Sequence, residues 1–363
     1  MTTPDLYAYH PDMNRRQFQT QLCAAALIGQ NLYARQDGDR RIRAGQIGTR
    51  HAHADGQLQA LRSGSDFEIV GVVAEDDAAW EAARKRGAYK GLPRMSLEEL
   101  LSQPGLRMVN VETPVRGLLD AAEAVVDAGL HLGLDKPAGE SLPQFRRILQ
   151  KADERGRLVK MGYMFRYNPA FELALRALKE GWLGPVTVLH AEMSKQLVGA
   201  AREDLAGYAG GSMFELGCHL IDSVVRFLGV PEKVTPFLRH APEDGLADNM
   251  TAVLEYPGTL VTLRSSLREV TGGARRQMVI SGDNGTLEIL PLEPPQVRLT
   301  LKQAAGGHKS GVQTVPMEKR ERYEADWRDF AAAIRGEKAW EFTSKHDLAV
   351  QETVLKASGL PLE

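Results

Sequence analysis

The stretch RIRAGQIGTRHAHA, residues 41–54, decides the fold that this sequence predicts. Arg41 to Ile47 is typical of a strand, and a helical pattern begins at Ala54 and continues to Arg62. Gly48 follows the strand directly, and glycine permits the tight turn that carries a chain from a strand into a helix. The stretch therefore predicts the first unit of an α/β domain.

The alternation of strand and helix continues downstream. Phe67 to Ala74 is a β-branched run typical of a buried parallel strand, and Ser96 with Glu99 forms the capping box of a short helix. Further strands are predicted at 108–111 and 130–134, and further helices at 77–86 and 116–128. Four strands separated by helical segments predict a doubly wound parallel sheet, the Rossmann arrangement, over residues 40–162.

The second half of the chain has a different pattern. Asn168 is placed to cap a helix that Pro169 opens and that continues to Lys179. Strands separated by turns are then predicted at 185–193, 252–256, 260–266, 276–281 and 286–290. Residues 163–363 therefore predict an α+β domain with an open, mostly antiparallel sheet, and the fold class of the whole chain is α/β.

The composition excludes several classes of function. The 363 residues are 43% hydrophobic and 25% charged, as in a soluble globular protein of two domains. A formal net charge of −2 gives no long-range field for nucleic acid or an anionic membrane, and no apolar run is long enough for a membrane span. The partner is therefore expected to be a small molecule. Cys23 and Cys218 are too few for a disulfide framework.

Residues 1–39 need a separate interpretation. Arg15 and Arg16 precede a weakly apolar stretch, Leu22 to Gly29, as in a twin-arginine export signal whose true start would be Met13. This interpretation places the protein in the periplasm. The alternative is an N-terminal arm or short amphipathic helix that packs on the body of a cytoplasmic protein.

The residues beyond the carboxyl ends of the strands matter most, because ligands of doubly wound sheets bind there. In the turn Gly48-Thr49-Arg50-His51-Ala52-His53 the first glycine of a G-x-G-x-x-G fingerprint is present, but Arg50 and His53 occupy the other two glycine positions. Backbone N–H groups of this turn, that of Thr49 included, can still bind a pyrophosphate. Arg50 either contacts that phosphate or is a solvated loop arginine.

Two further features bear on the ligand of this turn. His51 and His53 suggest a metal, but the sequence offers no third and fourth ligand at a suitable spacing, so no metal is expected. Glu75 ends the second strand, where the fingerprint places an acid on the adenosine ribose. A carboxylate there accepts from the 2′-hydroxyl and repels a 2′-phosphate, which favours NAD over NADP. The alternative is an ordinary acidic loop, since Asp76 and Asp77 follow.

Two proline-containing segments follow later strands of the same sheet. Thr113-Pro114 follows one strand and Asp135-Lys136-Pro137 follows another, so both segments are expected in the crevice that holds the cofactor. A residue before proline is extended, which aims Lys136 away from the strand end. Burial would lower the pKa of Lys136 and let it share protons near neutral pH. A lone Lys-Pro is usually a surface feature, but its place at a strand end indicates function here.

Five segments of the chain form a characteristic set. They are the Gly48-Thr49 turn, Thr113-Pro114, Asp135-Lys136-Pro137, GYMFRYNP at 162–169 and GGSMFELGCHLID at 210–222. Together they resemble the glucose-fructose oxidoreductase, inositol dehydrogenase and MocA family, from about Arg41 to the C-terminus. Asp135 stands where the family usually has Glu, Glu215 stands where it usually has Asp, and two fingerprint glycines are absent. The resemblance implies a nicotinamide-dependent oxidoreductase of sugars or polyols, with an open-faced sheet that often pairs subunits into a homo-oligomer.

A predicted helix from Met213 to Leu228 has a polar stripe. At about 100° per residue, the stripe consists of Glu215, His219, Asp222 and Arg226. The carboxylate of Glu215 and the imidazole of His219 can touch, because they are four positions apart. Gly210-Gly211 just before the helix permits close approach of a ligand. The alternative is an ordinary half-exposed amphipathic helix.

With the family resemblance, these residues receive roles in hydride transfer from a carbinol carbon to a nicotinamide. His219 is the expected base, Glu215 would orient its ring, and Lys136 would hydrogen-bond the reacting oxygen and stabilise its charge. The candidates for holding substrate hydroxyls are Tyr163, Arg166 and Asn168. Each of these three also has a structural alternative, such as the helix cap already given for Asn168.

Three functions stay open from the sequence. The first is an NAD-dependent dehydrogenase that acts on a sugar, polyol or related secondary alcohol. The second retains NAD and returns the hydride to the substrate, as in epimerisation or redox-assisted glycoside cleavage, which suits an exported protein because free NAD is scarce outside the cytoplasm. The third is a binding protein without turnover, suggested by Arg50 and His53 in the fingerprint, and the presence of Lys136 and His219 argues against it.

Overall fold

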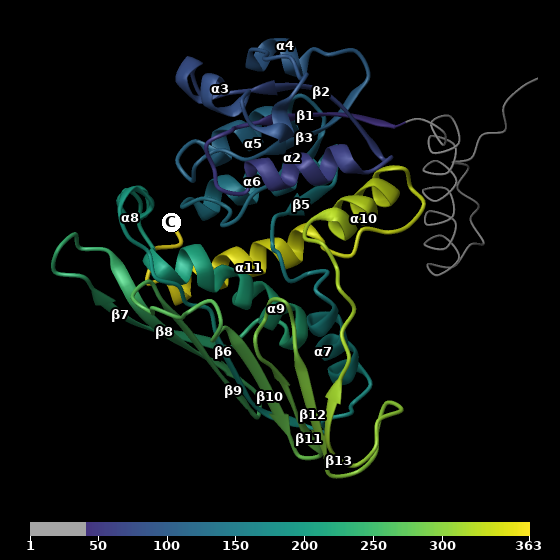
Figure 1. The fold of residues 1–363 in the computed structure, drawn as a ribbon, viewed down its shortest axis with the longest axis vertical. Coiled ribbons are helices and arrows are strands. Elements are labelled where there is room, and N and C mark those ends of the chain that lie inside the picture. Colours follow the sequence, from purple (N-terminus) through teal and green to yellow (C-terminus); the bar gives the residue numbers. More distant parts are fainter. Residues whose placement is uncertain (1–40) are drawn as a thin grey trace, which may run out of the picture.

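The computed structural model describes residues 41–363. It contains two sheets, which Figure 1 shows one above the other with helices between and around them. The predicted twin-arginine segment, residues 1–39, lies outside the described residues. Within the described part, no helix is long and apolar enough to cross a membrane.

The first sheet is parallel and has the strand order β2-β1-β3-β4-β5. Its strands are β1 (Ile42–Ile47), β2 (Phe67–Val73), β3 (Leu106–Val111), β4 (His131–Leu134) and β5 (Val159–Met161). The predicted doubly wound sheet is confirmed, and the strand that the prediction omits, β5, has only three residues and so no period to detect. The order reverses between β1 and β3, and a ligand is expected at the carboxyl ends of these two strands.

Helices cover both faces of this sheet (Figure 1). They are α2 (Ala54–Ser63), α3 (Asp77–Ala83), α4 (Leu97–Leu101), α5 (Leu118–Asp127) and α6 (Leu142–Glu154), with a short 3-10 turn η1 (Gly87–Tyr89) after α3. The capping box that begins α4 is confirmed, since the Ser96 hydroxyl accepts from Glu99 N at 3.1 Å and the Glu99 carboxylate accepts from Ser96 N at 2.7 Å. Because helices pack on both sides, all four residues of β4 are buried.

The second sheet has the order β13-β12-β11-β10-β6-β9-β8-β7, and of its pairings in the described chain the β6–β9 pair alone is parallel. Its strands are β6 (Val186–Glu192), β7 (Lys233–His240), β8 (Ala247–Tyr256), β9 (Thr259–Ser266), β10 (Gln277–Gly282), β11 (Gly285–Ile289), β12 (Val297–Leu301) and β13 (Gly311–Val315). The predicted mostly antiparallel sheet is confirmed. The prediction omits β7, β12 and β13; β7 and β13 are edge strands with mostly exposed side chains, which weakens their hydrophobic pattern.

Helices α7 (Pro169–Lys179), α9 (Cys218–Leu228) and α11 (Ser344–Ala357) cover one face of the second sheet (Figure 1). Between α7 and α9 the chain forms α8 (Ala200–Ala206) and a π-helical turn, η2 (Met213–Gly217). Apolar side chains are exposed on the opposite face: Val188 is 47% exposed, Leu260 is 56% exposed, and the two are cross-strand partners. No segment within residues 41–363 covers Val188 or Leu260 on that face.

The C-terminal helices tie the two sheets together. Helix α10 (Glu324–Ile334) packs beside α2 (Figure 1), where Trp327 Nε1 donates to Gln57 Oε1 at 2.8 Å. Helix α11 lies between the sheets, and its buried Gln351 accepts from Ala138 N at 3.2 Å and donates to Gly139 O at 2.6 Å. These bonds fix the loop that follows β4. The domain boundaries predicted from the sequence place all residues after 162 in the second domain, whereas helix α10 packs on the first sheet.

We predict that Gly48→Ala destabilises the fold more than Gly117→Ala. Both glycines have a positive φ, 98° and 85°, so each alanine introduces backbone strain of roughly 1–2 kcal/mol. At Gly48 the new Cβ would also lie 2.4 Å from Glu112 O, which adds about 1–3 kcal/mol of overpacking. At the exposed Gly117 nothing described lies within 4 Å of the new Cβ. Denaturant unfolding of the two variants tests this, and equal losses would show that the turn is not held against β3.

Candidate active site

The turn after β1 is packed against the end of β3. Gly48 N donates to Val73 O at 2.8 Å, and a Cβ at Gly48 would lie 2.4 Å from Glu112 O and 2.6 Å from Thr113 N. Only glycine therefore fits, as expected for the first glycine of the fingerprint. The Thr113-Pro114 segment lies beside this turn, as the sequence predicts, and the buried Thr113 hydroxyl has no hydrogen-bond partner among residues 41–363.

Glu75 is held at the turn by three hydrogen bonds. Its carboxylate accepts from Thr49 N at 3.0 Å, from Thr49 Oγ1 at 2.8 Å and from Arg50 N at 3.1 Å. Glu75 itself is exposed, so its carboxylate is fixed at the rim between β1 and β2, where an acid that binds ribose is expected. Thr49 and Arg50 thus use their N–H groups to orient Glu75, in place of the expected contact with a phosphate.

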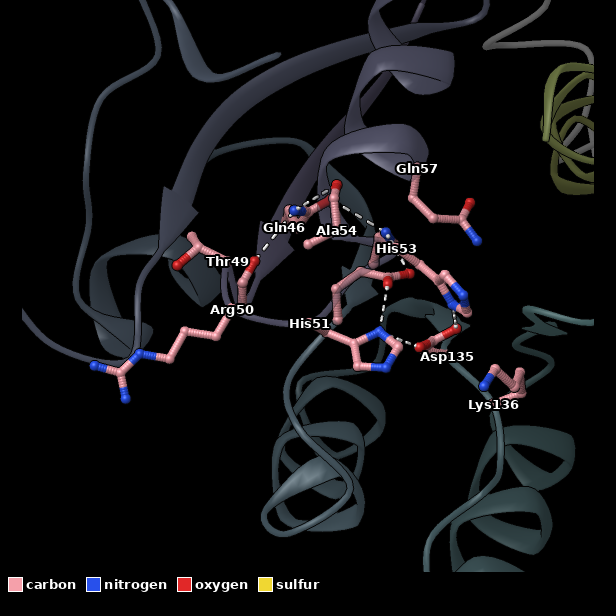
Figure 2. Close-up of polar contacts among 12 residues, drawn as sticks. Gln46, Thr49, Arg50, His51, His53, Ala54, Gln57, Asp135 and Lys136 are labelled. Carbon is pink, nitrogen blue, oxygen red and sulfur yellow. Dashed lines mark hydrogen bonds and ion pairs between the residues drawn. The ribbon is translucent and has the colours of Figure 1, made fainter. Parts of the chain in front are cut away.

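The side chain of Arg50 points away from the rest of the turn (Figure 2). Its guanidinium pairs with Asp76 at 2.5 Å, and the two side chains are 51% and 48% exposed. Without a bound dinucleotide, Arg50 therefore has an acidic partner and a largely solvated side chain. The side chain at the second glycine position of the fingerprint therefore does not lie over the turn.

His51 and His53 point toward a common partner, Asp135, at the end of β4 (Figure 2). His51 Nδ1 lies 2.5 Å from Asp135 Oδ2, and His53 Nδ1 lies 3.1 Å from Asp135 Oδ1. Glu112, fully buried at the end of β3, has Oε2 at 3.8 Å from His51 Nδ1. The sequence argument about the two histidines overlooked both acids. Their positions directly after predicted strands were the signal that could have found them.

The charges of this cluster, His51, His53, Glu112 and Asp135, shift its pKa values. Burial alone would lower the pKa of His51, but the charge of Asp135 and hydrogen bonds to Asp135 and Glu112 raise it to about 10. Burial, with the charge of Asp135, raises the pKa of Glu112 to about 7. Burial also opposes ionisation of Asp135, but the two imidazoles outweigh it and hold the pKa of Asp135 well below its usual value. His51 is therefore an imidazolium at neutral pH, and it places this positive charge within the turn.

The turn fits a dinucleotide although two fingerprint glycines are missing. In the described part of the chain, no residue accepts a hydrogen bond from the backbone N–H of His51, Ala52 or His53, which immediately precede α2. Backbone N–H groups at a helix start bind phosphate, and the His51 imidazolium adds positive charge next to them. Glu75 supplies the acceptor for a ribose and Thr113 supplies a hydroxyl without a partner. These groups can hold the two halves of a dinucleotide.

Lys136 forms an ion pair that joins the two domains. Its side chain is 1% exposed, and Nζ donates to Glu215 Oε1 at 2.8 Å and to Glu215 O at 3.0 Å. Tyr208 donates to the other oxygen, Glu215 Oε2, at 2.9 Å. Burial alone would lower the pKa of Lys136, but Glu215, with Cys218 and Asp135, raises that pKa above its ordinary value. The expectation that Lys136 shares protons near neutral pH is therefore wrong, because Glu215 accompanies it into the interior and keeps it charged.

Glu215 serves a different partner from the one that the helical spacing predicts. It lies in the π-helical turn η2, which changes the spacing before α9 begins, and its two oxygens bind Lys136 and Tyr208. Glu215 therefore positions Lys136 rather than the imidazole of His219. The glycines before the turn are also needed for packing, since a Cβ on Gly211 would lie 2.0 Å from Ala247 O.

His219 lies behind the lysine, 2% exposed, with the Tyr163 ring edge-on at 6.0 Å between centroids. Its Nδ1 accepts a long hydrogen bond, 3.4 Å, from Met164 N. Burial, and then the charges of Lys136 and His53, hold the pKa of His219 well below 6.5. The ring is therefore neutral at neutral pH, with its lone pair on Nδ1.

The three candidate substrate residues are all buried. Arg166 is 3% exposed and its Nη2 binds Asp222 Oδ1 at 2.7 Å and Asp347 Oδ1 at 2.5 Å. The Asn168 side chain caps α7, accepting from Ala170 N at 3.0 Å, and Tyr163 is 1% exposed. The buried Tyr163 hydroxyl has no hydrogen-bond partner among residues 41–363, and Asn168 also lines a cavity. Because Asp222 is buried with Arg166, the polar stripe of α9 is part of the core and not a half-exposed face.

A cavity of about 220 Å³ opens among residues from the second domain. It is lined by residues within 164–169, 293–295 and 317–326. Tyr323, in the wall of this cavity, lies 6.4 Å from the His53 ring between centroids. Tyr323 thus brings one wall of the cavity next to the ring of His53, while Lys136, Glu215 and His219 are not among the residues that line it.

A dinucleotide turn and a buried lysine–glutamate pair, placed between a parallel and an antiparallel sheet, define a two-domain oxidoreductase that binds a nicotinamide dinucleotide. Comparison with known families agrees. Residues 42–163 match the family described as "Oxidoreductase family, NAD-binding Rossmann fold", and residues 171–288 match the GFO/IDH/MocA C-terminal domain. The chain belongs to the GFO/IDH/MocA oxidoreductase family, which confirms the resemblance found in the sequence.

Individual relatives are distant. The chain is 28% identical over 229 residues to trans-1,2-dihydrobenzene-1,2-diol dehydrogenase of Macaca fascicularis, covering 62% of this chain and 67% of the relative. It is 27% identical over 217 residues to D-xylose 1-dehydrogenase (NADP(+)) 2 of Haloferax volcanii, covering 58% and 65%. Among solved structures, UDP-N-acetylglucosamine 3-dehydrogenase GnnA of Acidithiobacillus ferrooxidans has a TM-score of 0.74 at 21% identity, over 88% of this chain and 97% of that one. These similarities establish the family and the fold. They do not identify the substrate, and they do not decide between NAD and NADP.

We predict that the protein loses stability as pH rises from about 6.5 to 10, and that His51→Asn flattens this slope. A group whose pKa is raised by folding stabilises the native state below its unfolded pKa, and this stabilisation is lost as pH rises through the folded value. For His51 these limits are 6.5 and about 10. Unfolding free energies at pH values across this window should fall by about 2–4 kcal/mol more in the wild type than in the variant. The same slope in both proteins would show that His51 is not charged by the cluster.

Proposed function

We propose that the protein is an NAD-dependent oxidoreductase that transfers a hydride between the nicotinamide and a secondary alcohol of a sugar, polyol or related compound. The observation that carries this proposal is the buried ion pair of Lys136 with Glu215. Lys136 directly follows Asp135, and the carboxylate of Asp135 binds His51 of the cofactor turn. A charged lysine and a neutral histidine in one crevice supply what alcohol oxidation requires, a donor to the reacting oxygen and an acceptor for its proton.

Lys136 has one N–H left for the substrate. An ammonium has three N–H groups, and two of them go to Glu215 Oε1 and Glu215 O. The third is the donor that binds the reacting oxygen and stabilises the negative charge that develops on it. Glu215 and Tyr208 hold Nζ in place and keep it charged, so this donor persists across the neutral pH range.

His219 is the proton acceptor in this proposal. NAD, when bound, supplies the hydride acceptor. The neutral ring of His219 takes the hydroxyl proton on Nδ1, and the long hydrogen bond from Met164 N at 3.4 Å must break in this step, because it occupies the same lone pair. A base with a low pKa is available at all pH values above that pKa, so His219 does not need to lose a proton before each cycle.

Glu75 supports NAD as the cofactor. Three hydrogen bonds fix its carboxylate at the end of β2, where it would accept from a 2′-hydroxyl and repel a 2′-phosphate. One relative is named for NADP, so the preference depends on this chain's own residues. The names of two relatives, a dehydrogenase of a diol and one of D-xylose, support an alcohol as the substrate.

A second function applies if residues 1–39 are an export signal. Arg15 and Arg16 with the stretch Leu22 to Gly29 favour export to the periplasm, where an enzyme that exchanged NAD in each cycle would stall. Such an enzyme would retain NAD and return each hydride, acting as an epimerase or as a redox-assisted glycoside-cleaving enzyme. Without export, the protein is a cytoplasmic dehydrogenase.

We also propose that the open face of the second sheet pairs chains into a homo-oligomer. Val188 on β6 and Leu260 on β9 are neighbours at its centre, and Phe237 on β7 is 54% exposed. An apolar face of this kind is typical of an interface between subunits.

We predict that Lys136→Met and His219→Gln each lower turnover by about a hundredfold or more, because each removes a group that acts on the transferred proton or the oxygen charge. Binding of NADH, measured by fluorescence titration, should change by no more than a few-fold. Lys151→Met is the matched control, since this lysine pairs with Glu123 and Asp127 on the surface of the first domain. Turnover is measured on the best substrate of a panel of sugars and polyols. Wild-type turnover in both Lys136→Met and His219→Gln would refute the catalytic roles of these two residues.

We predict that Glu75→Ala narrows the preference for NAD over NADP by about tenfold or more, since it removes the charge that repels a 2′-phosphate. Asp77→Asn is the control: this side chain is 92% exposed and pairs with Arg94 away from the turn. Dissociation constants of NADH and NADPH for the three proteins measure the effect. A wild type that binds NADPH more tightly than NADH would refute the role of Glu75.

A further inference from the structure

Two cationic side chains, Lys195 and Arg276, leave the second sheet at the same end. Lys195 follows β6 and Arg276 immediately precedes β10, and these strands pair antiparallel with Glu192 opposite Gln277. Arg276 Nε donates to Ser194 O at 3.2 Å, one residue before Lys195. Both side chains are partly buried. The two positive charges are therefore close together and shielded from bulk water.

Neither cation has an anionic partner, unlike its neighbours. Arg264 pairs with Glu192 and Glu269, and Arg275 pairs with Glu269 at 2.7 Å. Within residues 41–363, no carboxylate forms an ion pair with Lys195 or Arg276, and nothing accepts a hydrogen bond from Lys195 Nζ or from either Nη of Arg276. Partly buried cations are costly unless they are paired, so an outside anion would stabilise this arrangement.

Hydrogen bonds join the segment before Lys195 to the segment before Glu215. Ser265 Oγ contacts Met193 O and Ser212 O, both at 2.9 Å, and so joins the segment that carries Lys195 to the start of η2, which carries Glu215. The charges of these residues also affect the pKa of Lys195. Burial lowers this pKa, the charge of Glu215 raises it, and the charges of Lys136 and Arg276 lower it further.

Arg276 contacts the segment that leads into one wall of the cavity, since its backbone O accepts from Leu292 N at 3.1 Å, one residue before Glu293. Burial and the charge of Arg322 lower the pKa of Arg276, while Glu293 opposes them, and both of these residues line the cavity of about 220 Å³. Lys195 is therefore near enough to interact with the Lys136–Glu215 pair, and Arg276 is bonded to the segment that leads into the cavity wall. The chain as a whole has a formal net charge of −2, so this local excess of positive charge does not belong to a generally basic surface.

We propose that Lys195 and Arg276 form an anion subsite for the substrate, which is then a sugar or polyol that carries a carboxylate or a phosphate. The two Nη groups of Arg276 suit planar, bidentate binding of such a group, and Lys195 adds a point charge. The proposal rests on the proposed function, because it assigns the substrate class of the same crevice. Lys136 acts on the reacting oxygen, and the anion subsite holds the substrate at a second point.

Binding to the NADH-loaded protein tests the subsite without turnover. Calorimetric titration with glucose, glucuronate and glucose 6-phosphate should show at least about tenfold tighter binding of one acidic sugar than of glucose, weakening with added salt. Preference for glucuronate identifies a carboxylate, and preference for glucose 6-phosphate identifies a phosphate. Lys195→Met and Arg276→Met should each lose most of the preference, whereas Arg275→Met, which removes a paired neighbour, should keep it.

Two results overturn the subsite: equal or weaker binding of both acids relative to glucose, or an unchanged preference in the double variant Lys195→Met, Arg276→Met. The affinity of each variant for NADH shows that it is folded. Failure of the wild type to bind NADH would refute the proposed function itself, while normal NADH binding without an acid preference would refute the anion subsite alone.

Discussion

The structure depends on one buried ion pair, between Lys136 at the end of β4 and Glu215 in the turn η2. An unpaired charge in the interior costs several kcal/mol, so neither residue can be buried here without the other. The pair therefore requires the two domains to meet at this point. Tyr208 binds the second oxygen of Glu215, and Gln351 of α11 fixes the loop after Lys136, so three separate segments of the chain hold one ammonium group.

A second balance of charge shapes the cofactor turn. Glu112 and Asp135 are buried at the ends of β3 and β4, and His51 and His53 approach them from the turn. The residues that break the glycine fingerprint are therefore accommodated, because His53 directs its side chain at Asp135 and Arg50 directs its own to solvent. The turn thereby has a fixed imidazolium next to backbone N–H groups that have no acceptor among residues 41–363.

The sequence placed several residues of the crevice at the ends of strands, but it overlooked Glu112 and Asp135 as partners of the histidines. Gly48, Glu75 and Lys136 could be predicted because strand patterns are local and the crevice lies at the strand ends. Partners from distant segments could not be predicted: Glu215 was assigned to His219 four positions away, but a π-helical turn intervenes and its partner is Lys136 in the other domain. Arg166 and Asn168 belong to a motif whose polarity suggests ligand binding, whereas their partners, among them Asp222, lie in the core.

The central claim is that the Gly48 turn binds a nicotinamide dinucleotide in the crevice closed by Lys136 and Glu215. Native mass spectrometry of the purified protein, before and after addition of NADH and NADPH, measures this most directly. We predict one NAD(H) for each chain, already present on purification if the cofactor is retained and present only after addition if it is exchanged. A protein that carries no nucleotide at saturating concentrations of both cofactors would contradict the account.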